Sequence, residues 1–291
     1  MWFFWALVAS WLYCISLEAN KRYPLDGLSL VCLRGAGASI YLAPFVGFME
    51  WPGDPMYYIV VLLTAAISVV GMMVQFNLAA KHNGRVANMS QPVTIIFAFA
   101  IWLFIDHHEL HRMMTDSGYA LGTLAAFSLM IVCLQFLRRN DTGWLAFMAI
   151  FPVGVLYAID GVLSKLMLDT GTDSMGIALN WVWLGNIFMT LVALPVVLSR
   201  KKTAPVNIMA IARNQWFAVM GGSLAHSISW LAISLAFIAA PNPAYPGVVT
   251  SMSPIWFAIY YKFSGTKDSL SPVAGFGLAV ASIILLIITT N

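Results

Sequence analysis

Apolar runs, each close to the length that crosses a bilayer, constrain this chain most. A helix needs about 20 mostly apolar residues to span the hydrocarbon core. Runs of this kind fall near residues 2–19, 28–49, 56–79, 86–105, 117–137, 144–164, 175–198, 215–239, 243–262 and 270–289. Only 9% of the residues are charged, against about a quarter in soluble domains. We therefore predict an all-α polytopic membrane protein with ten transmembrane helices.

A short internal sequence repeat, called the echo below, indicates that the chain is duplicated. The segment Leu12–Lys21 (LYCISLEANK) is matched by Leu156–Lys165 (LYAIDGVLSK), where Leu, Tyr, Ile and Lys recur in register. Ten runs divide into five and five near Asp141, and an odd number of helices per half makes the second half enter the membrane from the opposite face. We predict two inverted five-helix repeats, residues 1–141 and 142–291, within one integral membrane domain.

Prolines in matching helices indicate where a binding site lies. Pro92 in the fourth run corresponds to Pro254 in the ninth, and interrupted helices at corresponding positions of two repeats point to the substrate. The run Asn242–Pro254 holds three prolines and several hydroxyls, and irregular backbone at membrane depth lines a cavity or is buried in protein. We predict a cavity wall or gate here, with Pro246 and Pro254 at the gate and Ser253 as a polar contact. A tight loop before an ordinary helix start is the alternative.

Each copy of the echo carries an acid beside aromatic side chains. Glu18 follows Trp11 by seven residues, and Asp160 follows Tyr157 by three, so each pair shares a helix face. Acids inside membrane helices are costly and face a cavity or a partner. We predict that these four side chains bind a cationic group or exchange a proton. The alternative for Glu18 is an ion pair at the membrane surface with the basic residues that follow it.

Three further side chains are candidate substrate contacts. Arg34 lies early in the second run and is suited to neutralising Glu18 or to binding a substrate carboxylate in bidentate fashion. A structural ion pair or a side chain extended to the membrane surface is the alternative. His226 and Trp230 are four residues apart in the eighth run. A neutral His hydrogen-bonded between helices is the alternative for His226.

No motif for metal, nucleotide or covalent chemistry emerges. The stretch Asp106–His111 (DHHELH) is not HExxH, because Arg112 stands where the second His belongs. The sequence has no phosphate-binding glycine loop and no nucleophile elbow. We expect no metal, no cofactor, no nucleic-acid partner and no enzymatic activity.

Four features of the sequence can be compared with known families: the ten helices, the five-helix duplication, the prolines of runs four and nine, and the acidic DHHEL (Asp106–Leu110) that closes run four. In these features the chain resembles the drug/metabolite transporter superfamily, in its EamA-type branch. The resemblance implies small-metabolite transport through a central cavity lined by helices 1, 3, 4, 6, 8 and 9, commonly as an exporter. We expect a secondary transporter, an exporter or exchanger of a small polar or amphiphilic metabolite such as an amino acid or amine, that works by alternating access. Its partners would be the substrate and the bilayer, with proton coupling as one driving force. A monomer suffices for a complete cavity, and a dimer stays open.

Two other classes of function stay open: a membrane-embedded enzyme or carrier acting on lipid-linked substrates, and a receptor or assembly scaffold.

The orientation of the chain in the membrane is a further open point. Loops after odd-numbered helices hold twelve Lys and Arg, and the other face holds two, so the positive-inside rule puts both termini outside. The family resemblance implies cytoplasmic termini instead, and we follow the charge count. We expect a multi-pass protein of a bacterial inner membrane.

Overall fold

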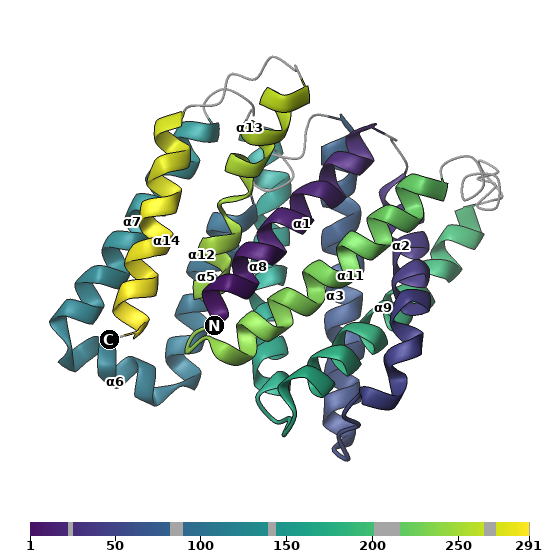
Figure 1. Cartoon of the computed structure of the whole chain (residues 1–291), viewed down its shortest axis with the longest axis horizontal. Helices are drawn as coiled ribbons and strands as arrows, with labels where there is room; N and C mark the ends of the chain where they lie inside the picture. Colours follow the sequence, from purple (N-terminus) through teal and green to yellow (C-terminus); the bar gives the residue numbers. More distant parts are fainter. Residues whose placement is uncertain (23–25, 82–89, 139–143, 201–215, 265–271, 291) are drawn as a thin grey trace.

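The computed structural model describes residues 1–22, 26–81, 90–138, 144–200, 216–264 and 272–290, which form helices and short connections with no strand among them (Figure 1). The elements are α1 (Trp2–Arg22), α2 (Gly27–Leu42), the 3-10 helix η1 (Ala43–Phe48), α3 (Pro55–Lys81), α5 (Gln91–Ile105), α6 (His107–Thr115), α7 (Ser117–Arg138), α8 (Trp144–Leu168), α9 (Ser174–Arg200), α11 (Trp216–Ala239), α12 (Ala244–Thr250), α13 (Ser253–Ser264) and α14 (Pro272–Thr290). The described part of each predicted apolar run falls on one of these helices or on two consecutive ones.

Several helices have the length and apolarity of membrane spans. Within the described residues, five qualify: Gly27–Phe48, Pro55–Leu78, Ile150–Leu168, Ser174–Ser199 and Val219–Ala239. The count is six if the pair Gln91–Ile105 and His107–Thr115, bent by 100°, forms one broken span. Three shorter apolar helices cover Trp2–Glu18, Ser117–Cys133 and Phe276–Thr290. This makeup is compatible with a membrane protein.

The ninth predicted run is a broken helix rather than a continuous one. It divides into α12 and α13 at Ser251 and Met252. Pro254 has no backbone N–H, so it cannot donate to the carbonyl of Thr250, four residues earlier. That carbonyl accepts a hydrogen bond from the hydroxyl of Ser10 in α1 instead, at 3.2 Å. The break is thereby tied to the first helix.

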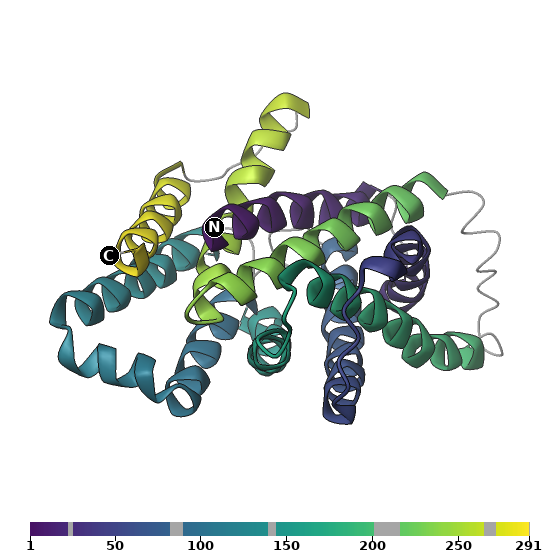
Figure 2. The same cartoon turned by 60° about the horizontal axis from the view of Figure 1, so that its bottom comes forward.

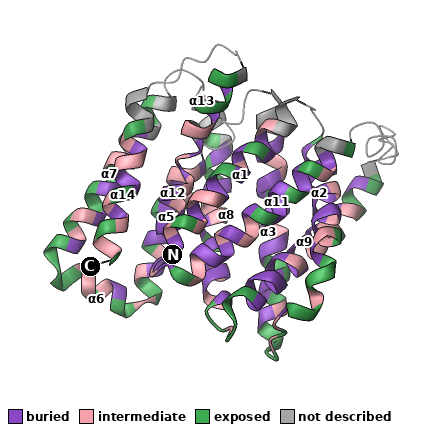
Figure 3. Ribbon diagram, viewed as in Figure 1, coloured by how far each residue is buried: buried purple, intermediate pink, exposed green. Residues whose placement is uncertain are grey.

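The helices pack as a bundle in which distant parts of the chain alternate. α1 lies along α11, α8 packs against both α3 and α5, and α2 crosses α9. α7 and α14 lie side by side at one end of the molecule, with α6 running below them (Figure 1, Figure 2). Buried and exposed residues alternate along the helices (Figure 3), and many of the exposed residues are large apolar side chains. Apolar outer faces suit a lipid surrounding.

Ordered contacts also join connections at the ends of the bundle. Glu50, which precedes α3, accepts hydrogen bonds from the backbone N–H groups of Thr172 and Asp173, which precede α9, at 2.8–3.0 Å. These N–H donors lower the pKa of the Glu50 carboxyl below its ordinary value, because they stabilise the ionised form. The carboxylate of Glu50 therefore fastens two connections that lie far apart in the sequence.

We expect Glu50→Gln to lower the thermal unfolding midpoint of the detergent-solubilised protein at neutral pH. Since the pKa of Glu50 is lowered in the folded state, its stabilisation is present above the unfolded-state pKa and is lost as pH falls through the folded-state pKa. The wild-type advantage should therefore shrink below about pH 4.5. Melting curves across pH check this, and an advantage that is the same at acidic and neutral pH would contradict it.

Candidate functional site

A cavity of about 170 Å³ lies inside the bundle. Its walls come from α1, α3, α5, α8, α11 and α12, which are far apart in the sequence. Most of its surface is apolar, with a few polar groups facing inward, as is usual for small-molecule sites. It is lined by Ala9, Tyr13, Ser68, Met72, Gln75, Gln91, Thr94, Ile95, Ala98, Tyr157, Asp160, Gly161, Ser229, Trp230, Ile233, Phe237, Pro243, Ala244, Gly247 and Thr250.

The two copies of the echo meet in the wall of this cavity. Tyr13 and Tyr157, which occupy the same position in the two segments, both donate to the side-chain oxygen of Gln75 in α3, at 2.6 and 3.0 Å. The amide nitrogen of Gln75 donates to the hydroxyl of Ser90 at 3.2 Å. Gly71 allows this arrangement, because a Cβ at that position would come within 2.5 Å of the Tyr157 ring. One amide therefore holds both tyrosines at the cavity.

Asp160 is the only charged side chain among the described residues that line the cavity. It lies three residues beyond Tyr157 on α8, within hydrogen-bonding reach of the hydroxyl of Ser68. A second cavity, of about 60 Å³, is also lined by Asp160 and Ser68. The carboxyl of Asp160 therefore lies where a substrate inside the bundle can reach it.

Aromatic rings surround this acid. Trp230 and Phe237 of α11 line both cavities, and Tyr13 and Tyr157 line the larger one. Ring faces attract cations, most strongly when water is excluded. The arrangement is suited chemically to holding a positive group beside an acid.

Of the residues predicted from the sequence, Asp160, Tyr157 and Trp230 lie together at the cavity. Glu18 and Trp11 do not line it. A carboxylate oxygen of Glu18 accepts a hydrogen bond from the hydroxyl of Tyr261 at 2.8 Å, and Trp11 is 51% exposed. The structure therefore brings only the second acid and its partners to the cavity.

Arg34 is almost fully buried away from both cavities. Its guanidinium donates to the hydroxyl and, at 2.8 Å, to the carbonyl of Ser16, and lies 4.7 Å from the centre of the Phe76 ring. Within the described part of the chain no ion pair joins Arg34 to Glu18. Arg34 fastens α2 to α1 in this conformation.

The remaining predicted residues surround the site without lining the larger cavity. The His226 ring lies 4.8 Å from that of Trp230, and its Nε2 is buried without a hydrogen-bond partner in the described structure. The carbonyl of Ser253 accepts from the thiol of Cys14 at 3.2 Å. Pro246 is buried in α12, of which Ala244, Gly247 and Thr250 line the cavity, and the side chain of Pro254 lies outside the described residues.

Several cavity residues were not predicted as contacts. Tyr13 was identifiable in principle, because the echo aligns it with Tyr157. Gln75 is of the polar type that more often forms hydrogen bonds between neighbouring helices than binds a ligand. Nothing in the spacing of Ser68 or Phe237 distinguishes them from other residues of their helices.

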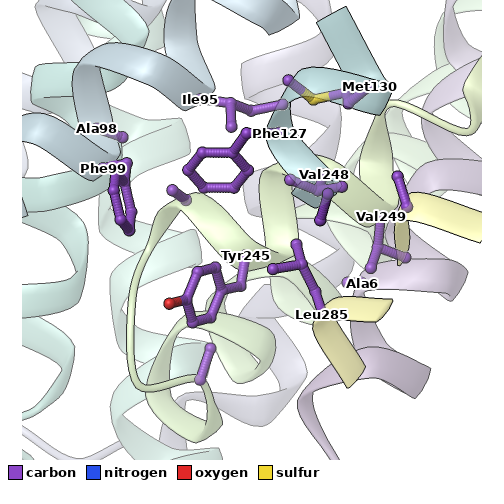
Figure 4. Close-up of a cluster of buried hydrophobic side chains, with 14 of the residues drawn as sticks. Ala6, Ile95, Ala98, Phe99, Phe127, Met130, Tyr245, Val248, Val249 and Leu285 are labelled. Atoms are coloured by element: carbon purple, nitrogen blue, oxygen red, sulfur yellow. The ribbon is translucent and has the colours of Figure 1, made fainter. Parts of the chain in front are cut away.

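A buried carboxylate outside the cavity holds α12 in place. Glu109 of α6 accepts from the hydroxyls of Tyr119 and Tyr245 at 2.6 and 2.7 Å, and the two hydroxyls are 2.6 Å apart. Figure 4 shows Tyr245 among apolar side chains of α1, α5, α7, α12 and α14. Arg112 lies over the Tyr119 ring at 4.0 Å. Because Tyr245 directly follows the cavity residue Ala244, this cluster positions the cavity wall.

The stretch Asp106–His111 forms no metal site in the structure. Asp106 caps the N-terminus of α6 by accepting from the backbone N–H of His108 and Glu109, and the three histidines of the stretch are exposed. No group of three or more His, Cys, Asp or Glu among the described residues is arranged to hold a metal ion.

Comparison with known proteins establishes the fold alone. No family model and no curated protein matches the sequence. A solved structure, described only as a crystal structure of a protein, superposes with a TM-score of 0.64 at 12% identity, covering 99% of this chain and 98% of its own. The arrangement over nearly the whole chain is therefore one that another protein also adopts.

We expect Glu109→Leu to destabilise the protein by about 1–3 kcal/mol, because it leaves two buried tyrosine hydroxyls without their acceptor. Glu109→Gln is the matched control. Its side-chain oxygen can still accept, so its loss should be smaller. Unfolding midpoints in detergent measure both, and a Glu109→Leu variant as stable as wild type would show that the cluster does not hold α12.

Proposed function

We propose that this protein is a secondary transporter of a small polar or amphiphilic metabolite such as an amino acid or amine, working by alternating access. The observation that carries the proposal is the cavity in which Asp160 lies among aromatic rings, with walls supplied by helices from both halves of the chain. An acid placed there inside an apolar bundle marks a substrate or proton pathway more often than a structural pair.

The packing of the helices supports two related halves. If α1, α2, α3, α5 and α7 correspond to α8, α9, α11, α12–α13 and α14, contacts recur in equivalent pairs. α1 packs on α11 as α8 packs on α3, α2 packs on α11 as α9 packs on α3, and α12 packs on α1 as α5 packs on α8. The pairs α2–α9 and α7–α14 then join equivalent helices. This pattern is what an inverted repeat of five helices produces.

Individual hydrogen bonds follow the same correspondence. The hydroxyl of Thr94 in α5 donates to the carbonyl of Gly154 in α8 at 3.1 Å. Trp256 of α13, equivalent to Thr94 in the register of Pro92 and Pro254, donates its indole N–H to the hydroxyl of Ser10 in α1 at 3.1 Å. Ser10 and Gly154 are equivalent positions in the register that aligns Tyr13 with Tyr157. The interruption of α12 and α13 thus adjoins α1 where α5 adjoins α8.

Contacts between helix ends support ten crossings. Glu50, after the second predicted span, bonds Thr172, after the sixth. Arg112, after the fourth, donates to the carbonyl of Ile288 near the end of the tenth at 3.4 Å. Each contact joins ends that alternating crossings put on the same face of the membrane. The three apolar helices too short to qualify by length are counted as crossings in this proposal.

The alternative functions find less support. An enzyme acting on lipid-linked substrates needs reactive groups together, and Asp106–His111 was its nearest candidate. There the histidines point outward and Glu109 is engaged by two tyrosines. A scaffold would leave Asp160 and the cavity without a role. The resemblance to EamA-type transporters agrees with transport, in a multi-pass protein of a bacterial inner membrane.

The direct test is flux into liposomes that hold the purified protein, screened with radiolabelled amino acids and amines. Asp160→Asn should reduce transport of the accepted substrate at least 10-fold, because the charge at the cavity is lost. Glu18→Gln is the matched control, since the acid in the first copy of the echo does not line the cavity, and it should keep near wild-type flux. Equal flux in wild type and Asp160→Asn would exclude the proposed role of Asp160.

The charge distribution of the loops gives a second test. With twelve basic residues in the loops after odd helices and two on the other face, we expect both termini outside the cytoplasm. Fusing alkaline phosphatase or green fluorescent protein to the C-terminus in a bacterial host reads this out. Phosphatase activity without fluorescence supports the charge count, and the reverse supports the orientation that the family resemblance implies.

A further inference from the structure

Two cavities meet at Asp160. The larger has a volume of about 170 Å³ and the smaller about 60 Å³. Ser68, Asp160, Trp230, Ile233 and Phe237 line both. The acid therefore lies at the boundary of two compartments of different size.

The smaller cavity has little room, and polar groups make up a larger share of its lining than in the larger cavity. The hydroxyl residues Thr64, Ser164 and Ser234 line it, and the ring of Trp181 lies against it together with Trp230. One water needs about 10–15 Å³ on this measure, so the space holds on the order of five water-sized groups. An ammonium group fits this space when bare and nearly fills it when it carries three methyl groups.

The larger cavity suits the body of a ligand. Its lining includes the large side chains of Tyr13, Met72, Tyr157 and Phe237, and most of the surface that faces the cavity is apolar. Rings at its boundary with Asp160 can stack on an apolar body and also face a cationic head. The two compartments thus differ in chemistry as well as in size.

A substrate carboxylate has no cationic partner here. Among the described residues lining either cavity, Asp160 is the only charged one. The buried cations of the described residues are engaged elsewhere: Lys165 contacts Asp169 at 2.8 Å and the carbonyl of Phe237 at 3.0 Å, and Arg34 donates to Ser16. An anionic group bound beside Asp160 would be repelled and unpaired, which is costly in an apolar interior.

We infer that the substrate is an organic monocation without a carboxylate, whose ammonium head occupies the smaller cavity beside Asp160 and whose apolar tail occupies the larger one. This rests on the proposed transport function and narrows its substrate from amino acids and amines to amines. It also implies that the smaller cavity selects the cationic head of the substrate and that the larger cavity selects its apolar tail.

Two glycines allow each compartment to be narrowed separately. A Cβ at Gly185 would lie 3.4 Å from the Trp230 ring, with nothing else within 4 Å, at the smaller cavity. A Cβ at Gly161 would lie 3.6 Å from the Phe237 ring, likewise with no other neighbour, at the larger cavity. Both distances are ordinary contacts, so alanine fits at either position, and each of the two glycines lines only one of the compartments.

The first experiment titrates the purified full-length protein with phenethylamine and with L-phenylalanine, which differ only by a carboxylate. We expect the amine to bind at least 10-fold more tightly. Asp160→Asn should weaken amine binding by about 10- to 100-fold, the usual worth of a hydrogen bond to a charged partner. The inference is overturned if phenylalanine binds as tightly as the amine, or if neither compound binds the folded wild-type protein.

The second experiment separates the compartments. Gly185→Ala should weaken binding of phenethyltrimethylammonium several-fold relative to phenethylamine, because the larger head needs the whole of the smaller cavity. Gly161→Ala should leave the ratio of these two affinities unchanged. It should weaken the binding of 4-phenylbutylamine, which has the longer tail, relative to that of phenethylamine. If both variants change the two ratios alike, the division into head and tail compartments is wrong.

Liposome flux distinguishes this inference from the proposed function. Amine binding with the expected pattern but without flux would refute transport and leave the binding site standing. Flux of a carboxylate-bearing metabolite that is unaffected by Asp160→Asn would preserve transport and refute the amine site.

Discussion

The packing at the centre of this structure depends on one side-chain amide oxygen, that of Gln75. The side-chain oxygen of Gln75 accepts the hydroxyls of Tyr13 and Tyr157, which come from opposite halves of the chain. Polar groups inside an apolar bundle are costly when they lack partners, and these three side chains satisfy one another. Their convergence fixes α1 and α8 relative to α3, and Asp160, one turn beyond Tyr157, is thereby placed in the cavity.

The opposite wall is held by a different means. Pro254 interrupts the helix between α12 and α13, and the freed carbonyl of Thr250 is bonded by Ser10. Glu109 anchors Tyr245 from outside the cavity. The segment that lines the cavity is thus short, and is fastened near both ends by side chains from other helices.

The positions of the helices followed from the sequence, because spans of apolar residues have a length set by the bilayer. The faces of those helices were harder to assign. Glu18 and Trp11 satisfied the same spacing argument as Asp160 and Tyr157, yet Trp11 is exposed and Glu18 bonds Tyr261. Lipid-facing and protein-facing residues are both apolar in such a helix, so spacing shows which residues share a face and not which face turns inward. Tyr13 was available through the echo, whereas Gln75 and Ser68 depended on tertiary packing that spacing does not encode.

The most direct test of the account is to locate a bound amine. Crystals or cryo-microscopy grids of the protein with 4-iodophenethylamine would reveal the iodine by its scattering. The account predicts iodine in the larger cavity, among Tyr13, Tyr157 and Phe237, with the ammonium beside Asp160 and directed to the smaller cavity. Iodine bound elsewhere, or an ammonium remote from Asp160, would contradict the assignment of this cavity as the substrate site.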